Sequence, residues 1–206
     1  MRFYSNRLSG NCYKVRLLLD LLGIKVEEVE IDIFRSRETH PDFLARSPEG
    51  KVPVIEFDDG TVLAESGAIL FHLACGSPYL PDAALVRSEI LQWMFFEQNQ
   101  HEPSVAVARS LQLYSEPGLE REVSIQAVRA KGQRALGTME RHLKEREFFV
   151  RDFFTIADIA LYPYTRRAEE GGFSLQPYPA VRSWLGRVES VPGFVPFVTE
   201  GPVEIP

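Results

Sequence analysis

The chain has 206 residues and a formal net charge of −6, with 45% apolar and 25% charged residues. These proportions are ordinary for a soluble globular protein, and the length favours one or two domains. The acidic charge argues against general nucleic-acid binding, and no apolar run approaches the ~20 residues that cross a membrane. The two cysteines lie in separate predicted elements and suit a reducing compartment. We therefore expect a cytoplasmic protein with neither a nucleic-acid nor a membrane partner.

The first third of the chain alternates between strand and helix patterns. In order, the patterns predict a strand at Arg2–Ser5, a helix at Asn11–Leu22 that Gly23 ends, a strand through Val29, Ile31 and Ile33, strands at Val54–Phe57 and Thr61–Leu63, and a helix from about Ser66. The order β-α-β, connector, β-β-α is thioredoxin-like, and it packs the first helix against the sheet.

The loop after the first strand has the sequence Ser9-Gly10-Asn11-Cys12. A redox thioredoxin has Cys-x-x-Cys at this place, whereas this chain has Ser9 where the attacking cysteine would be. Cys12 suits a small buried position, because free cysteine is often buried. The Ser9 hydroxyl can cap the helix or donate to a thiolate that a ligand brings.

Two further features lie around the third strand. Pro53 stands at the mouth of an apolar strand, where proline is tolerated at an edge, and the Val52–Pro53 bond is a candidate for the cis form. Glu65-Ser66 precedes an apolar helix, so a carboxylate, a hydroxyl and a helix N-terminus meet there. Together they suit an extended ligand that carries an amine and a carboxylate. The alternative is a plain hairpin edge followed by an ordinary helix cap.

The rest of the chain predicts helices alone, at Leu85–Gln100, Glu120–Arg146, Thr155–Ala168 and Ala180–Glu189. Prolines and glycines near residues 76–81 mark a linker, so we expect domains at 1–77 and 85–206, joined by residues 78–84. Thr155 and Asp158 form a predicted capping box with a structural role. The tail from residue 191 should lie extended on the surface. The four histidines lack metal-ligand spacing, and we expect no metal site.

At this point the chain resembles the cytosolic glutathione transferases. Ser9-x-Asn11-Cys12 resembles the loop of the serine-type classes (theta, delta and zeta relatives), and three further motifs resemble the family's glutathione site: Pro41-x-Phe43-Leu44, Ser47-Pro48-x-Gly50-Lys51-Val52-Pro53 and Glu65-Ser66-x-Ala68-Ile69-Leu70. The chain departs from the family's common pattern in having Ser47 where Asn is frequent, and Asn11 where many members have Pro.

The resemblance implies a thioredoxin-like domain followed by an all-helical domain, with glutathione as co-substrate and no other cofactor. The thiol of glutathione would lie over Ser9 or Asn11, the catalytic candidates. The cysteinyl backbone would pair at Val52, beside Pro53. The remaining implied contacts involve Glu65 with the α-ammonium, Ser66 with the α-carboxylate, and Lys51 and His40 with the glycyl end.

The predicted electrophile pocket comes from the helical half. Its candidates are Trp93, Phe96, Arg109, Tyr114 and Tyr162, and for the aromatic residues the alternative is ordinary core packing. The resemblance also implies a two-fold homodimer, with Leu91–Gln100 at the interface and Trp93 or Phe96 among its apolar contacts.

The expected function is transfer of the glutathione thiolate to a small hydrophobic electrophile, which makes the protein an enzyme of detoxification. Two alternatives remain open. One is a glutathione-dependent thiol–disulfide reductase or peroxidase, with Cys12 as the candidate nucleophile of a reductase. The other is a non-catalytic protein of the same fold that binds or regulates. Low exposure of Cys12 would count against the reductase.

Overall fold

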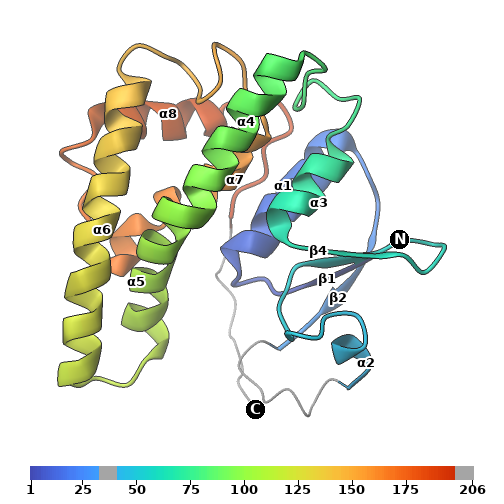
Figure 1. The fold of residues 1–206 in the computed structure, drawn as a ribbon, viewed down its shortest axis with the longest axis horizontal. Coiled ribbons are helices and arrows are strands. Elements are labelled where there is room, and N and C mark those ends of the chain that lie inside the picture. Colours follow the sequence, from blue (N-terminus) through green and yellow to red (C-terminus); the bar gives the residue numbers. More distant parts are fainter. Residues whose placement is uncertain (33–40, 198–206) are drawn as a thin grey trace. The chain divides into compact units, whose positions relative to one another are not determined.

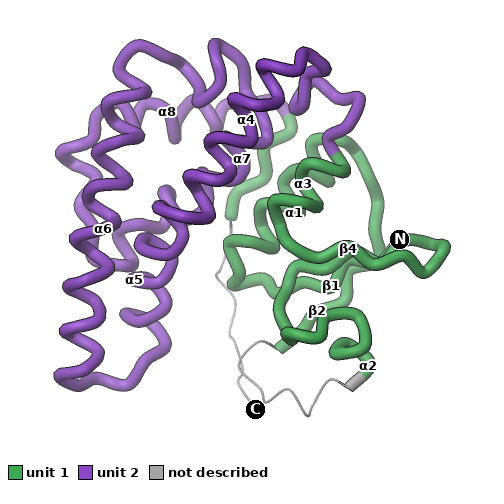
Figure 2. The backbone as a smooth tube through the Cα atoms, viewed as in Figure 1, with its two compact units in different colours: residues 1–73, 193–206 green, residues 74–192 purple. Residues whose placement is uncertain are grey.

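The computed structural model describes residues 1–32 and 41–197, and its internal contacts divide the chain into two compact units (Figures 1 and 2). Unit 1 contains Met1–Leu73 and Gly193–Pro206, and unit 2 contains Ala74–Pro192. The boundary after Leu73 lies close to the predicted linker at 78–84. The segment from Gly193 differs from the expected domain limits, because it groups with unit 1 and not with the helices that precede it.

Unit 1 confirms the thioredoxin-like order. Its described elements are β1 (Arg2–Ser5), α1 (Gly10–Leu22), β2 (Glu27–Glu30), α2 (Pro41–Leu44), β3 (Val54–Glu56), β4 (Val62–Ala64) and α3 (Ser66–Leu73). The described strands form one sheet in the order β2-β1-β3-β4. β1 pairs with β2 in parallel, whereas the β1–β3 and β3–β4 pairs are antiparallel.

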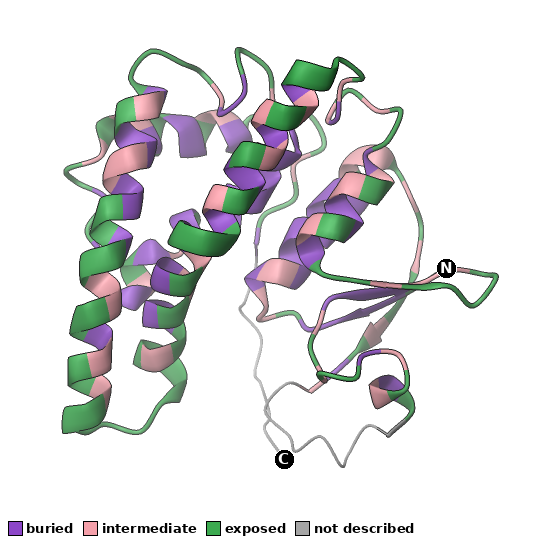
Figure 3. Ribbon diagram, viewed as in Figure 1, coloured by how far each residue is buried: buried purple, intermediate pink, exposed green. Residues whose placement is uncertain are grey.

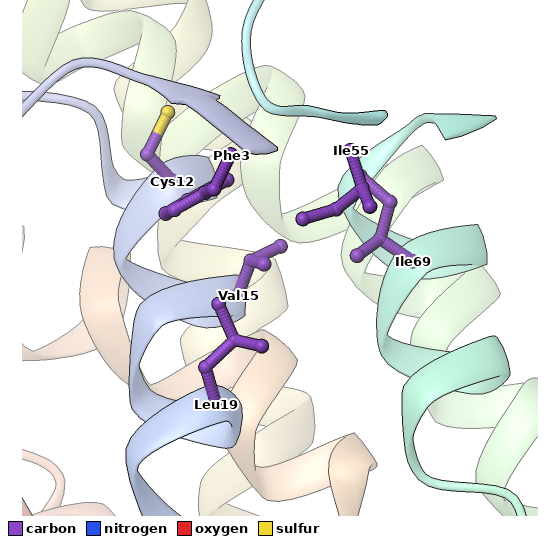
Figure 4. Close-up of a cluster of buried hydrophobic side chains, with 6 residues drawn as sticks. All are labelled: Phe3, Cys12, Val15, Leu19, Ile55 and Ile69. Carbon is purple, nitrogen blue, oxygen red and sulfur yellow. The ribbon is translucent and has the colours of Figure 1, made fainter. Parts of the chain in front are cut away.

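Alternation along β1 and β3 gives the sheet two apolar faces. Phe3 lies opposite Ile55, and both pack with residues of α1 and α3 (Figure 4). The next pair, Tyr4 and Val54, packs on the other face against Phe43 of α2. Successive side chains of a strand point to opposite faces, so each short strand serves both layers.

The prediction for β2 was wrong in its limits. The strand ends at Glu30, and Ile31 beyond it is buried, with its N–H donating to the carbonyl of Ser5 at 2.7 Å. Ile33 lies outside the described residues. The buried Ile31 of the apolar alternation therefore lies just after the end of β2. The strand itself lies at the edge of the sheet and consists largely of glutamates. Charged residues of this kind protect an edge from pairing with another chain.

Unit 2 confirms the predicted helical architecture. Its described helices are α4 (Ala84–Phe96), α5 (Glu102–Tyr114), α6 (Leu119–Leu143), α7 (Ile156–Arg166) and α8 (Pro179–Glu189), with a π-helical segment at Glu97–His101 and a 3₁₀ turn at Ala168–Gly171. From Ile156 to Thr165 every residue of α7 is buried (Figure 3). A helix that is buried all round forms the centre of a helical unit.

Helix α5 was missing from the sequence prediction. Pro103 lies in the first turn of α5, immediately after a π-helical segment, which is where a helix can accommodate a residue without an N–H. The π-helical segment Glu97–His101 connects it directly to α4. A proline that looks like an interruption is here the start of a helix.

The tail predicted from residue 191 is described as far as Phe197, and this part is anchored to unit 1 through Tyr13. The hydroxyl of Tyr13 on α1 donates to the carbonyl of Val195 at 2.6 Å. The ring of Phe197 stacks on the same tyrosine with 4.7 Å between centroids, and Phe197 is buried. Among the residues that the structure describes, no helix combines the length and the apolar character needed to cross a membrane.

Candidate functional site

The start of α1 carries the first predicted site residue. Ser9 is the N-cap in an extended conformation, half-buried, and its hydroxyl accepts a hydrogen bond from the backbone N–H of Cys12 at 3.3 Å. The first turn, Gly10–Tyr13, contains no Asp or Glu. A helix N-terminus has partial positive charge, so an anion is stabilised there. The chain supplies no such anion within this turn.

Cys12 is a core residue. Its side chain is fully buried beside Phe3 (Figure 4), and its sulfur accepts a hydrogen bond from the backbone N–H of Asn6 at 3.3 Å. Burial raises the pKa of the Cys12 thiol to about 11, although the hydrogen bonds from Ser9 and Asn6 oppose the rise. A buried, protonated thiol is a poor nucleophile. This arrangement counts against Cys12 as the attacking group of a reductase.

Asn11 and Ser66 come together from different elements. The Asn11 carbonyl oxygen Oδ1 accepts a hydrogen bond from the ammonium of Lys14 at 2.7 Å. The Ser66 hydroxyl at the start of α3 lies 3.5 Å from the same oxygen, and Ser66 is buried. Residues implied for the thiol and for the γ-glutamyl carboxylate are therefore neighbours. Lys14 was not among the predicted site residues, and its position three residues after Asn11 on a helix was the available signal.

Glu65 joins β4 to α3 in an unusual backbone conformation. Its φ angle is 68°, in the left-handed region, and its carbonyl accepts the N–H of Ile69 at 2.9 Å. The side chain is exposed. A left-handed non-glycine residue costs about 1–3 kcal/mol, and such residues cluster at functional sites. The conformation supports a role for this carboxylate beyond capping the helix.

The segment before β3 holds Val52 and Pro53. Their peptide bond is cis, as the sequence analysis considered. Val52 is partly buried and packs against the apolar clusters on both faces of the sheet. The expected sheet edge was wrong, because β3 lies between β1 and β4. Since β3 begins at Val54, the Val52 backbone still lies outside the strand ladder. Pairing of an extended peptide at Val52 stays a prediction.

Ser47 explains one departure from the family's pattern. Its hydroxyl accepts the N–H of Lys51 at 3.1 Å and donates to the Lys51 carbonyl at 2.9 Å. One serine side chain thus closes the turn that leads to Val52. The Lys51 ammonium is exposed and lies 2.7 Å from the carboxylate of Glu49. His40, the other candidate for the glycyl end, lies outside the described residues.

An ion pair fixes this segment to the sheet. The Arg46 guanidinium donates to Glu56 of β3 at 2.8 Å, and the Tyr4 hydroxyl donates to the same carboxylate at 2.5 Å. These hydrogen bonds, chiefly that from Arg46, lower the pKa of Glu56 to about 2. The carboxylate therefore stays ionised at ordinary pH, so the ion pair with Arg46 is retained there.

The candidates for the electrophile pocket lie in unit 2 and are dispersed. Trp93 is buried, with its ring 4.4 Å from His142, 4.6 Å from Phe149 and 5.1 Å from the partly buried Phe96. Tyr162 is buried and donates to Glu189 at 3.0 Å. These contacts are those of core packing. Their part in a pocket stays a prediction.

The two remaining pocket candidates differ in their surroundings. Arg109 is buried and forms an ion pair with Glu170. Tyr114 is exposed at the last turn of α5. Their roles likewise stay predictions.

Comparison with known proteins gives a consistent assignment for both units. The model of the glutathione S-transferase N-terminal domain matches residues 3–79, and that of the C-terminal domain matches residues 97–192. The crystal structure of a glutathione S-transferase from Pseudomonas fluorescens Pf-5 is 46% identical, with a TM-score of 0.92, over 96% of this chain and 98% of that one.

Two further similar proteins have other names. The disulfide-bond oxidoreductase YfcG of Escherichia coli K12 is 26% identical over 88% of this chain and 87% of its own length. A solved structure of Ure2p in complex with glutathione is 25% identical, with a TM-score of 0.85, over 93% of this chain and 95% of that one.

Proposed function

Because the chain belongs to the glutathione S-transferase family, we propose that unit 1 binds glutathione and stabilises its thiolate for attack on a small hydrophobic electrophile. The observation that carries the proposal is the contact between Asn11 and Ser66 at the start of two helices. This contact joins Asn11, a candidate to contact the glutathione thiol, to Ser66, the candidate to bind the γ-glutamyl carboxylate. The solved complex of Ure2p with glutathione supports this ligand class.

The tripeptide would extend across the polar positions of unit 1. The α-carboxylate binds the Ser66 hydroxyl and the N-terminus of α3, and the α-ammonium binds Glu65. The cysteinyl backbone pairs at Val52 in the manner of an added strand. Lys51 and His40 hold the glycyl carboxylate.

Chemistry then needs no protein base. A free thiol titrates near pH 8.5, and a hydrogen bond to a charged group contributes about 1.5–3 kcal/mol. One such bond from Ser9 or Asn11, with about 0.3–1 kcal/mol from the helix N-terminus, lowers the thiol pKa by roughly 1.5–3 units. The glutathione sulfur forms a bond to the electrophile, and the leaving group departs with the electron pair.

Calorimetric titration tests the binding step. Wild-type protein should bind glutathione, and Glu65→Gln should weaken binding about 10–100-fold, because the variant loses a charged hydrogen bond. Glu27→Gln is the matched control, since Glu27 is an exposed carboxylate of unit 1 that pairs with Arg2 on the β2 edge. No heat of binding with folded wild-type protein, or equal affinity in Glu65→Gln, would contradict the proposal.

A disulfide substrate is the second candidate, and the similarity to the E. coli disulfide-bond oxidoreductase favours it. In that reaction the glutathione thiolate attacks one sulfur of the disulfide, the S–S bond breaks, and the other sulfur leaves as a thiolate. Cys12 takes no part, because it is buried and its pKa is raised. Wild-type and Cys12→Ala proteins should therefore reduce a model disulfide equally, and loss of reduction in the variant would restore Cys12 as nucleophile.

A homodimer is part of the proposal. Phe95 of α4 is 62% exposed, whereas Trp93 on the same helix is buried. Phe95 is thus a better interface residue than the buried Trp93. Light scattering at micromolar concentration should give about twice the 23.4 kDa mass of the chain. A monomer that still turns over substrate would exclude the dimer and leave the chemistry intact.

A further inference from the structure

Lys14 of α1 is an unusual residue for a helix that packs on a sheet. Its side chain is only 1% exposed, although lysine is almost never fully buried unless it is paired. Its ammonium donates to Oδ1 of Asn11 at 2.7 Å, from three residues further along the helix. A buried lysine therefore contacts Asn11, a residue that we place at the thiol.

The contact fixes which end of the Asn11 amide faces Lys14. An ammonium has three donors and no acceptor, so only the carbonyl oxygen of Asn11 can face Lys14. The N–H₂ end then lies on the other side of the amide, away from Lys14. The orientation of an asparagine amide is commonly ambiguous, but a cation on one side removes the ambiguity.

Ser66 supports the same orientation from another helix. Its hydroxyl lies 3.5 Å from Oδ1 as a second, longer donor contact. A bound γ-glutamyl carboxylate would draw the Ser66 hydroxyl to itself. The ammonium of Lys14 is then the donor that keeps the amide in place while the ligand is bound.

We propose that Lys14 is a positioning residue for the thiolate, which holds the Asn11 carbonyl so that the Asn11 N–H₂ donates to the sulfur of glutathione. The inference rests on the proposed function. Orientation decides the sign of the interaction, because an N–H₂ donor stabilises a thiolate whereas a carbonyl oxygen repels it.

The test replaces Lys14 and measures the bound thiol. The ultraviolet absorbance of the thiolate, followed against pH, gives the pKa of glutathione in the complex. Lys14→Met should raise that pKa by about one unit and lower kcat near pH 6.5 about 10-fold, with little change in KM for glutathione. Lys14→Arg keeps a cationic donor, so its thiol pKa and its kcat should both lie close to the wild-type values. Arg16→Met is the control, because Arg16 is a cation of the same helix and pairs with Glu28 instead of Asn11.

A double-mutant cycle separates positioning from a general charge effect. If Lys14 acts through Asn11, adding Lys14→Met to Asn11→Ala should change the thiol pKa much less than it does in wild-type protein. Equal shifts in both backgrounds would overturn the positioning role. An unchanged pKa in Lys14→Met, with glutathione still bound, would overturn the inference and leave the proposed function standing.

Two measurements on the wild-type protein test the inference independently of the Lys14 variants. Calorimetry on wild-type protein is done first, because absent glutathione binding refutes the proposed function itself and the inference with it. If Lys14→Met does not fold, nuclear magnetic resonance of the wild-type protein decides. The side-chain N–H₂ signals of Asn11 should shift when glutathione binds, and unchanged signals would overturn the inference.

Discussion

The N-termini of α1 and α7 are both capped by a side-chain hydroxyl, but only α7 also has a carboxylate in its first turn. At α7, the fully buried Thr155 caps the helix, and Asp158 in the first turn accepts the Thr155 N–H at 2.9 Å. The same carboxylate accepts the Phe149 N–H at 3.1 Å and the Trp184 indole N–H at 2.9 Å. At α1, Ser9 caps the helix while only half-buried, and the first turn has no carboxylate.

The difference shows how one local device serves two purposes. The α7 terminus contains its own carboxyl group, which accepts its hydrogen bonds inside unit 2 and fixes the helix there. The α1 terminus has a hydroxyl, an amide and a buried lysine nearby, which are groups that stabilise an anion from outside. A closed cap contributes stability, whereas an incomplete cap leaves the helix N-terminus available to the anion that our proposal places there.

The largest effect that separates the two caps is on stability. Asp158→Ala removes the acceptor of four buried donors, the Thr155 hydroxyl included, and should lower the free energy of unfolding by about 3–5 kcal/mol at pH 5. Glutathione affinity of the folded variant should be unchanged. Urea unfolding and calorimetry measure the two quantities. Weaker glutathione binding by folded Asp158→Ala would show that the caps are not independent.

The same variant has a pH dependence with a defined sign. Burial raises the pKa of Asp158 from 3.8 to about 6, although its hydrogen bonds oppose the rise. Because the folded pKa is above the unfolded one, this contribution to stability is complete below about pH 4 and is lost as the pH rises through about 6. The difference in free energy of unfolding between the wild-type protein and Asp158→Ala should therefore become smaller by roughly 1–3 kcal/mol from pH 4 to 7. A gap that widens with pH would contradict the assignment.

The next effect is on chemistry. Asn11→Asp gives α1 a first-turn carboxyl group like that of α7, with almost no change of shape. The carboxylate should repel the thiolate and reduce turnover at pH 7 about 10–100-fold, which is about 1.4–2.7 kcal/mol. Thermal stability should stay equal or rise slightly, because an acidic residue in the first turn favours the helix. Asn99→Asp, at an exposed asparagine of unit 2, is the control. Full turnover in Asn11→Asp would exclude Asn11 from the thiol site.

The smallest effect is a difference between the two cap hydroxyls. Thr155→Ala removes a buried cap and should cost about 2 kcal/mol of stability, whereas Ser9→Ala should cost about 0.5 kcal/mol. Turnover should fall in Ser9→Ala alone. Denaturant unfolding and steady-state kinetics on the two variants test this crossed pattern. Equal stability costs would mean that Ser9 is as much a structural residue as Thr155.

Short local patterns predicted most of the architecture. The capping box at Thr155 and Asp158 and the start of α3 at Ser66 were visible because caps and breakers act within a few residues. The α5 helix was missed because Pro103 has opposite meanings inside a helix and in its first turn. The chain alone cannot say which of the two applies.

The candidate site was predictable only where a motif carries it. Glu65 and Ser66 stand out in the sequence, whereas Lys14 does not, because its burial depends on packing by distant residues. Aromatic residues of the helical half were ambiguous for the same reason. Trp93 lies among His142 and Phe149, and an aromatic residue of a core has the same sequence pattern as one of a pocket.

The anchored tail sets an order of events during synthesis. Tyr13 enters the growing chain early, and its hydrogen-bond acceptor Val195 follows 182 residues later. Throughout translation of unit 2, the face of α1 that Phe197 will cover stays without that cover. Unit 1 is therefore completed after unit 2 on the ribosome, although it is the first to emerge. A fragment ending at Leu73 would keep the sheet but leave this face of α1 exposed to water and to other chains.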